Sequence, residues 1–82
     1  MPTAVTPQNV EQTIVDSIVK LGPEPDEVTR DATFESLDVD SLDLVEVAQV
    51  VEEEFGVEIK GDDAQKLQTV GDAIDLVLER AS

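Results

Sequence analysis

Apolar residues recur at helical spacing in three stretches of the chain. In the first stretch the intervals are four, four and three residues, through Val10, Ile14, Ile18 and Leu21. A hydroxyl cap at Thr6 and a proline at Pro7, whose missing N–H has no partner to lose, mark the start of a helix. Gly22, Pro23 and Pro25 mark its end, because proline cannot continue the helical ladder.

The second stretch covers residues 41–55 and separates two faces. At 100° per residue its apolar side carries Leu44, Val47, Ala48, Val51 and Phe55. The opposite side carries Leu42, Glu46, Gln49 and Glu53. This pattern predicts an amphipathic helix with one buried and one exposed face, closed by Gly56 as its carboxyl-terminal cap.

Two further helices are expected towards the end of the chain. A short turn of helix is predicted over residues 62–67, after the connecting stretch VEIKG. Thr69 then caps a last helix, and Asp72 three positions on completes a weak capping box. The buried stripe of this last helix is expected to be Val70, Ala73, Ile74, Val77 and Leu78.

The segment between Gly22 and Asp40 shows no sustained period, although Phe34 and Leu37 are apolar enough to hold it on the core. A connection of this length is unusual in a small domain and indicates a functional loop. The expected fold is all-α: a small four-helix bundle with a short third helix and a long loop between helices 1 and 2. Residues 1–5 are expected to form a flexible tail, and residues 6–80 one domain.

Composition restricts how this domain is held together. The chain has 82 residues, no cysteine, no tryptophan or tyrosine and two phenylalanines, so the core must come from aliphatic residues. The first ten residues lack the basic and apolar regions of a secretory signal. No apolar run approaches the roughly 20 residues that span a bilayer. We therefore expect a soluble, cytoplasmic protein.

The charge of the chain restricts its partners. Five basic against twenty acidic residues give a net charge of −15. Such a surface repels phosphate backbones and anionic lipids, which argues against nucleic-acid and membrane partners. Partners with basic surfaces are expected instead, and divalent cations are expected only as weakly bound counter-charge.

The candidate for chemistry is Ser41, but the chain contains no histidine to take its proton, and the glycines of a nucleophile elbow are missing around it. The sequence therefore argues strongly against serine hydrolysis. Paired carboxylates for glycoside hydrolysis would need a cleft that so small a chain hardly offers. An EF-hand loop counted from Asp38 fails at Leu42, Asp43 and Gln49. No catalytic residue and no defined metal site are predicted.

Two interpretations of Ser41 remain. A helix start offers free N–H groups and the positive end of the helix dipole, which favour a phosphate bonded there. Ser41 would then be an exposed attachment point that another enzyme modifies. Alternatively Ser41 is an ordinary helix cap, or follows Asp40 as the cap. From the serine alone, capping is the more common role.

The surrounding residues favour attachment. DSLDLVE, the later EEEFGVEI stretch and TVGDAI together resemble the acyl carrier protein family, of the discrete bacterial type, from Thr6 to Arg80. The resemblance implies that Ser41 carries 4′-phosphopantetheine, transferred from coenzyme A by a phosphopantetheinyl transferase (holo-acyl carrier protein synthase). Growing acyl chains would be held on its thiol as thioesters, and the chain itself would not be an enzyme. Fatty acid biosynthesis is the expected pathway, with a polyketide or other specialised acyl pathway as the alternative and a non-enzymatic acidic binding module as the second.

The resemblance also implies a partner surface on the second helix. The protein is expected to be a monomer. It would contact basic surfaces of the transferase and of the chain-building enzymes through Asp40, Leu42, Asp43, Glu46, Glu52 and Glu53. Many relatives have a proline and then an acidic residue where this chain has Lys60 and Gly61, and an apolar residue where it has Gln49. The Val- and Ile-lined interior between the second helix and the long loop is expected to open for the acyl chain.

Overall fold

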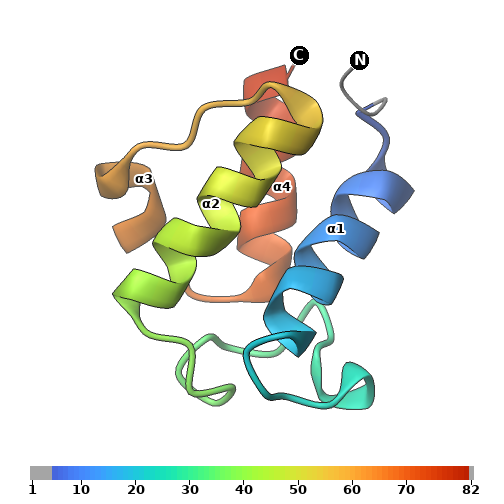
Figure 1. The fold of residues 1–82 in the computed structure, drawn as a ribbon, viewed down its shortest axis with the longest axis vertical. Coiled ribbons are helices and arrows are strands. Elements are labelled where there is room, and N and C mark those ends of the chain that lie inside the picture. Colours follow the sequence, from blue (N-terminus) through green and yellow to red (C-terminus); the bar gives the residue numbers. More distant parts are fainter. Residues whose placement is uncertain (1–4, 82) are drawn as a thin grey trace.

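The computed structural model describes residues 5–81, which form a helical bundle. In chain order the elements are α1 (Pro7–Val19), the 3-10 turn η1 (Pro25–Glu27), α2 (Ser41–Phe55), α3 (Gly61–Gln65) and α4 (Val70–Ala81). The described residues contain no strand, and the all-α prediction is confirmed. α1 begins and α4 ends at the end of the bundle where α2 also ends, whereas α2 begins at the opposite end (Figure 1). Residues 1–4 of the expected tail lie outside the described part.

α1 starts as predicted but ends earlier. The Asn9 N–H donates to the Thr6 hydroxyl at 3.1 Å, which caps the helix. The residues Val10, Ile14 and Ile18 are fully buried, as expected. The predicted end was wrong, because the Leu21 and Gly22 amides bond carbonyls three residues back, at 2.9 and 3.1 Å, and tighten the last turn. Leu21 therefore lies beyond the helix, half-buried against the core.

α2 matches its predicted bounds and its predicted faces. Val47, Val51 and Phe55 are buried, and Leu44 and Ala48 are half-buried. Gly56 takes a left-handed conformation (φ 70°, ψ 20°) that glycine adopts without strain. Its N–H donates to the Glu52 carbonyl at 2.8 Å, so Gly56 ends the helix as expected.

The two later helices differ in how well the sequence predicted them. α3 spans Gly61–Gln65 rather than 62–67, and the Lys60 N–H donates to the Asp63 carboxylate at 3.4 Å near its start. α4 begins with the predicted capping box. The Asp72 N–H donates to the Thr69 hydroxyl at 3.1 Å, and the Thr69 N–H donates to the Asp72 carboxylate at 3.2 Å. Its expected stripe is buried except for half-buried Leu78.

The long loop is an ordered part of the fold. Phe34 and Leu37 are buried as predicted, and Val28 and Val39, which the sequence analysis did not single out, are buried too. The loop runs antiparallel to the start of α4, with hydrogen bonds of 2.9 to 3.0 Å from Phe34 N–H to Gln68 C=O, Val70 N–H to Ala32 C=O and Gly71 N–H to Arg30 C=O. This pairing positions the segment that leads into α2.

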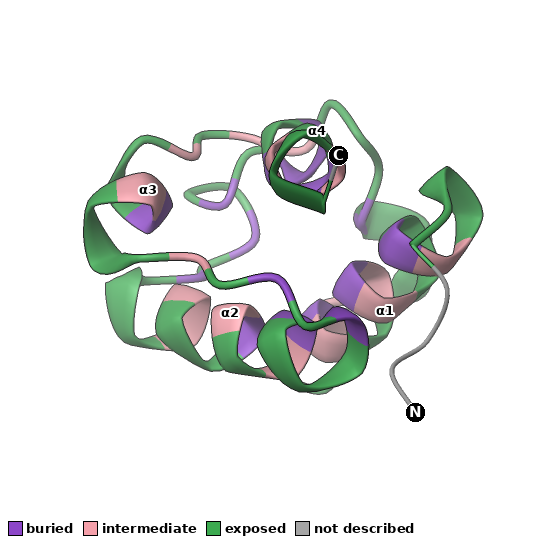
Figure 2. Ribbon diagram, turned by 90° about the horizontal axis from the view of Figure 1, so that it is seen from above, coloured by how far each residue is buried: buried purple, intermediate pink, exposed green. Residues whose placement is uncertain are grey.

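The interior is mainly aliphatic, as the composition predicts, with Phe34 and Phe55 as its aromatic members. The buried residues are apolar and lie on the inward faces of α1, α2 and α4 and along the connecting segments (Figure 2). No polar or charged side chain is buried among residues 5–81. Polar function must therefore lie on the surface.

Candidate functional site

The start of α2 settles which residue caps this helix. The Asp43 N–H donates to the Asp40 carboxylate at 2.9 Å, and the Asp40 N–H donates to the Asp43 carboxylate at 3.3 Å. This reciprocal pair is a capping box with Asp40 as the cap. Ser41 is the first residue of the helix itself. Of the two capping alternatives, the one that places Ser41 just after the cap is therefore correct.

The Ser41 side chain has no structural task in the described part of the chain. It is exposed, and no described group shares a hydrogen bond with its hydroxyl. The backbone N–H groups of the first helical turn are among those that a helix leaves without intrahelical partners. A hydroxyl that is solvent-accessible beside these groups can be reached by a modifying protein and can hold a phosphodiester at the positive end of the helix. These residues therefore fit a phosphopantetheine arm.

The segment before Ser41 is fixed in place. Val39 is buried, and its N–H donates to the Phe34 carbonyl at 2.9 Å. Asp38 has φ 58°, a left-handed conformation that closes this turn and that aspartate tolerates better than most residues. The serine thus sits on an anchored turn rather than on a free loop.

The structure places the predicted partner residues along the outer side of α2. Asp40, Leu42 and half-buried Asp43 surround Ser41, and Leu42 is 74% exposed. Glu46, Glu52 and Glu53 are exposed further along, and Glu52 lies about 16 Å from Ser41 by helical rise. Val45 is a further exposed apolar residue of α2, at 42% exposure, and was not among the predicted surface residues. Its position three residues after Leu42 places it on the same face and could have indicated it.

An apolar cavity lies inside the bundle. Its volume is about 10 Å³, and its lining is Ile14, Leu44, Val47, Ala48, Val51, Ile59, Ala64, Leu67, Ala73 and Val77. These residues come from α1, α2, α3, α4 and the segments on either side of α3. No residue of the long loop lines it, so this cavity does not lie between α2 and this loop, where the acyl chain is expected to enter. The lining follows from how α2, α3 and α4 pack together, which local sequence does not reveal.

A shallow groove lies outside this cavity, between α2 and α3. It has a volume of about 200 Å³ and includes Val45, Gln49, Glu52 and Lys60 in its lining. It shares Ala48, Ile59 and Ala64 with the cavity. These three side chains, from α2, the segment before α3 and α3 itself, therefore lie between the cavity and this groove.

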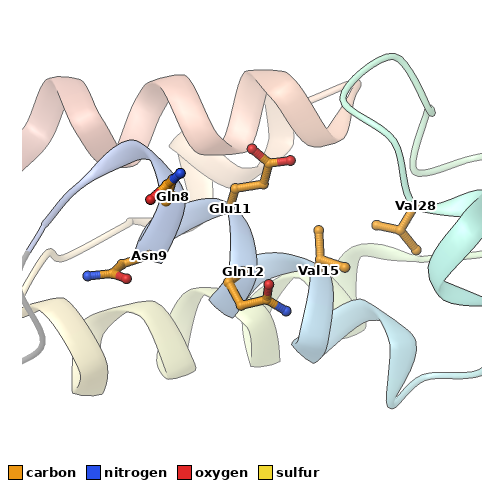
Figure 3. Close-up of a pocket in the computed structure, with 6 residues that line it drawn as sticks. All are labelled: Gln8, Asn9, Glu11, Gln12, Val15 and Val28. Carbon is orange, nitrogen blue, oxygen red and sulfur yellow. The ribbon is translucent and has the colours of Figure 1, made fainter.

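A wider hollow on the described surface does not include Ser41. It measures about 590 Å³ and is lined by Gln8, Asn9, Glu11, Gln12, Val15 and Val28. These side chains come from α1 and from the long loop, and they point apart rather than towards a common centre (Figure 3). A hollow without convergent polar groups offers no basis for chemistry.

Residues 5–81 bring together no group of three or more acidic, histidine or cysteine side chains that could hold a metal ion. Within the same range, no helix combines the length and the hydrophobicity needed to cross a bilayer.

Comparison with known proteins defines the class. A family profile described as "Phosphopantetheine attachment site" matches residues 12–77. The acyl carrier protein of Porphyromonas gingivalis is 49% identical over 70 residues, which cover 83% of this chain and 90% of that protein. The chain belongs to the acyl carrier protein family. It is a carrier and not a catalyst, and the alternative of an unrelated acidic binding module is set aside.

Solved structures agree with this assignment. The acetyl form of the actinorhodin acyl carrier protein from Streptomyces coelicolor superimposes with a TM-score of 0.70 at 29% identity, covering 93% of this chain and 90% of that one. Its 3,7-dioxo-octyl form superimposes with a TM-score of 0.75 at 28% identity, covering 99% and 95%. The four-helix fold predicted from sequence is thus the fold of the family, and 4′-phosphopantetheine is its cofactor.

Proposed function

We propose that Ser41 is the attachment point of 4′-phosphopantetheine and that the protein carries growing acyl chains for fatty acid biosynthesis. The observation that supports the attachment is the exposed Ser41 hydroxyl at the first position of α2, with capping already supplied by Asp40. When attached, the arm supplies a thiol, which the chain lacks because it has no cysteine, and on which acyl groups are held as thioesters. Residues 6–80 act as one carrier domain, in the cytoplasm and as a monomer.

The attachment is tested by loading the apo protein. Incubation with coenzyme A and a phosphopantetheinyl transferase is expected to add one phosphopantetheinyl group to the intact mass. Ser41→Ala is expected to abolish this gain. Ser36→Ala is the matched control, because Ser36 is also an exposed serine, located in the loop. A gain that survives Ser41→Ala would overturn the assignment.

The acidic face of α2 is the proposed docking surface for the transferase and the chain-building enzymes. It comprises Asp40, Leu42, Asp43, Glu46, Glu52 and Glu53, which we call the α2 acidic face. Asp40 and Asp43 lie next to the site of a phosphodiester that is itself negative, a repulsion that does not help folding. A basic partner surface would relieve it. Such complementarity mainly speeds association and weakens as salt screens charges beyond about 8–10 Å.

The cavity supports a fatty acyl cargo. All ten lining residues have hydrocarbon side chains. A saturated chain loses no hydrogen bond on entering such a space. Each keto group would lose its hydrogen bonds to water, and no side chain there could replace them. A polyketide pathway remains the second candidate, supported by the structural similarity to the actinorhodin carriers.

The two pathways are separated by comparing cargoes of equal length. We load the protein with a saturated eight-carbon acyl group and with an eight-carbon group bearing two keto oxygens, and record methyl NMR spectra of the lining residues. The saturated cargo is expected to shift the Ile59, Ala64 and Leu67 methyls more than the diketo cargo does, relative to an acetyl-loaded control. Larger shifts with the diketo cargo would favour the polyketide pathway.

A further inference from the structure

α3 forms the most weakly anchored wall of the apolar cavity. It is a single turn and a half of helix, too short to be stable alone, and it packs mainly on α2. Ala64 within it, and Ile59 and Leu67 on either side, line the cavity. The other walls belong to the longer helices α1, α2 and α4. Movement of α3 is therefore the least costly way to enlarge the cavity.

Enlargement is necessary before any acyl chain can enter. The cavity volume of about 10 Å³ is at most the space that one water molecule needs. A chain of several methylene groups requires far more. The structure is therefore that of the closed state, and contacts that hold α3 in this position oppose entry of a chain.

One side-chain contact ties α3 to a distant helix. Arg80, in the last turn of α4, donates to the Asp63 carboxylate at 2.7 Å across 17 positions of sequence. The Asp63 side chain is only 14% exposed, whereas that of Arg80 is 41% exposed. The ribbons of α3 and α4 stand apart (Figure 2). The Arg80–Asp63 pair therefore links two helices through side chains alone.

We propose that Arg80 is a positioning residue that holds α3 closed through Asp63 and thereby limits how much of the time an acyl chain occupies the cavity. This inference rests on the proposed function. Because the pair exists in the closed state, breaking it lowers the free energy of opening and leaves the open, chain-filled state better populated. A charge pair of this exposure changes such an equilibrium roughly two- to fivefold.

The chain offers a matched control near the middle of α4. Arg30 and Asp75 form the second described ion pair, at 3.0 Å, with side chains 49% and 67% exposed. This pair joins the long loop to α4, and neither of its residues lines the cavity. Arg30→Gln removes the same single positive charge as Arg80→Gln. Any effect of net charge alone must therefore appear equally in both variants.

The experiment uses protein loaded with a saturated eight-carbon acyl group. The ratio of cavity-bound to exposed chain is measured from the methyl shifts of Ala64 and Leu67, with acetyl-loaded protein as the empty reference. Arg80→Gln is expected to raise this ratio roughly two- to fivefold. Arg80→Lys, which keeps a charge that can reach Asp63, is expected to stay near the original ratio, and Arg30→Gln to leave it unchanged. An unchanged ratio in Arg80→Gln, or an equal rise in Arg30→Gln, overturns the proposal.

Salt and the apo protein provide independent readouts. Raising salt is expected to raise the ratio in the original protein but not in Arg80→Gln, where no pair is left to screen. If loading itself fails, the intact mass reports it and the attachment proposal fails alone. Relaxation dispersion of the same methyls in apo protein then still tests the role of the Arg80–Asp63 pair, because Arg80→Gln must increase the population of the open state. An unaltered population there counts against Arg80.

Discussion

At the scale of single residues, Asp40 and Ser41 divide two tasks that one residue often performs at a helix start. Asp40 accepts the Asp43 N–H at 2.9 Å and caps α2, whereas the Ser41 hydroxyl has no described partner. The stability of α2 and the chemistry at its first residue are therefore separable. Modification of Ser41 removes no contact that holds the helix.

This division predicts how two alanine variants differ. Ser41→Ala is expected to change the free energy of unfolding by less than about 0.5 kcal/mol, because an exposed side chain without partners is lost. Asp40→Ala is expected to cost about 1 kcal/mol through loss of the cap. Urea unfolding followed by circular dichroism measures both. A larger loss in Ser41→Ala than in Asp40→Ala would show that Ser41 contributes to capping.

A second prediction concerns Gly71. A β-carbon added there would lie 3.0 Å from the Arg30 carbonyl oxygen, which already accepts the Gly71 N–H at 2.9 Å. Gly71→Ala is expected to destabilise the protein by about 1 kcal/mol, because the loop must shift and stretch this bond. Gly61→Ala is the control: its β-carbon meets open space, and it should be neutral or stabilising by up to about 1 kcal/mol. Equal urea midpoints for the two variants would contradict this view of the loop.

At the scale of elements, periodicity predicted the helices and their buried faces. The end of α2 is set by Gly56, and the capping box of α4 is formed by Thr69 and Asp72. Both features involve residues only a few positions apart, so local sequence contains the necessary information. The structure of the long loop does not follow from it. Its hydrogen bonds join residues such as Phe34 and Gln68, far apart in sequence, and the turn η1 is short and carries no period.

The candidate site likewise has features that local sequence predicts and features that it does not. Ser41 and the charged residues around it were predictable, because a capped helix start and an amphipathic face are local patterns. The position of the cavity and the Arg80–Asp63 pair were not, since both depend on how α3 packs on α2 and on where α4 lies relative to it. Lys60 and Gln49, which the sequence analysis noted as departures from relatives, both line the groove between α2 and α3.

For the α2 acidic face, one charge reversal tests its role in docking. Glu46→Lys is expected to slow phosphopantetheinyl loading several-fold at low salt, because association with a basic partner loses its steering. Glu11→Lys, an exposed change on α1 with the same effect on net charge, should slow it less. Initial rates of loading by mass spectrometry measure both, and the difference should shrink as salt is raised. Equal slowing by the two variants would assign the effect to net charge.

At the scale of the whole molecule, charge opposes folding. With a net charge of −15 on 82 residues and two described ion pairs, the surface repels itself. The mainly aliphatic core must overcome this repulsion without disulfides, tryptophan or tyrosine. Stability is therefore sensitive to ions in solution.

The corresponding prediction is a rise in melting temperature with Mg²⁺ at low ionic strength. Divalent cations gather around the acidic surface and reduce its self-repulsion, even without a defined site among residues 5–81. Thermal melts followed by circular dichroism over a Mg²⁺ titration measure the effect, and sodium chloride at much higher concentration should reproduce much of it. A melting temperature that stays constant throughout would refute the electrostatic explanation.

The arrangement of the helix ends has a practical consequence. Because α1 begins and α4 ends near the same end of the bundle, while α2 begins at the other (Figure 1), a tag, bead or fused domain joined at either terminus stands clear of Ser41. Immobilised protein should therefore accept the transferase as readily as free protein does. The same geometry would let a linker at either terminus leave the start of α2 accessible to a partner.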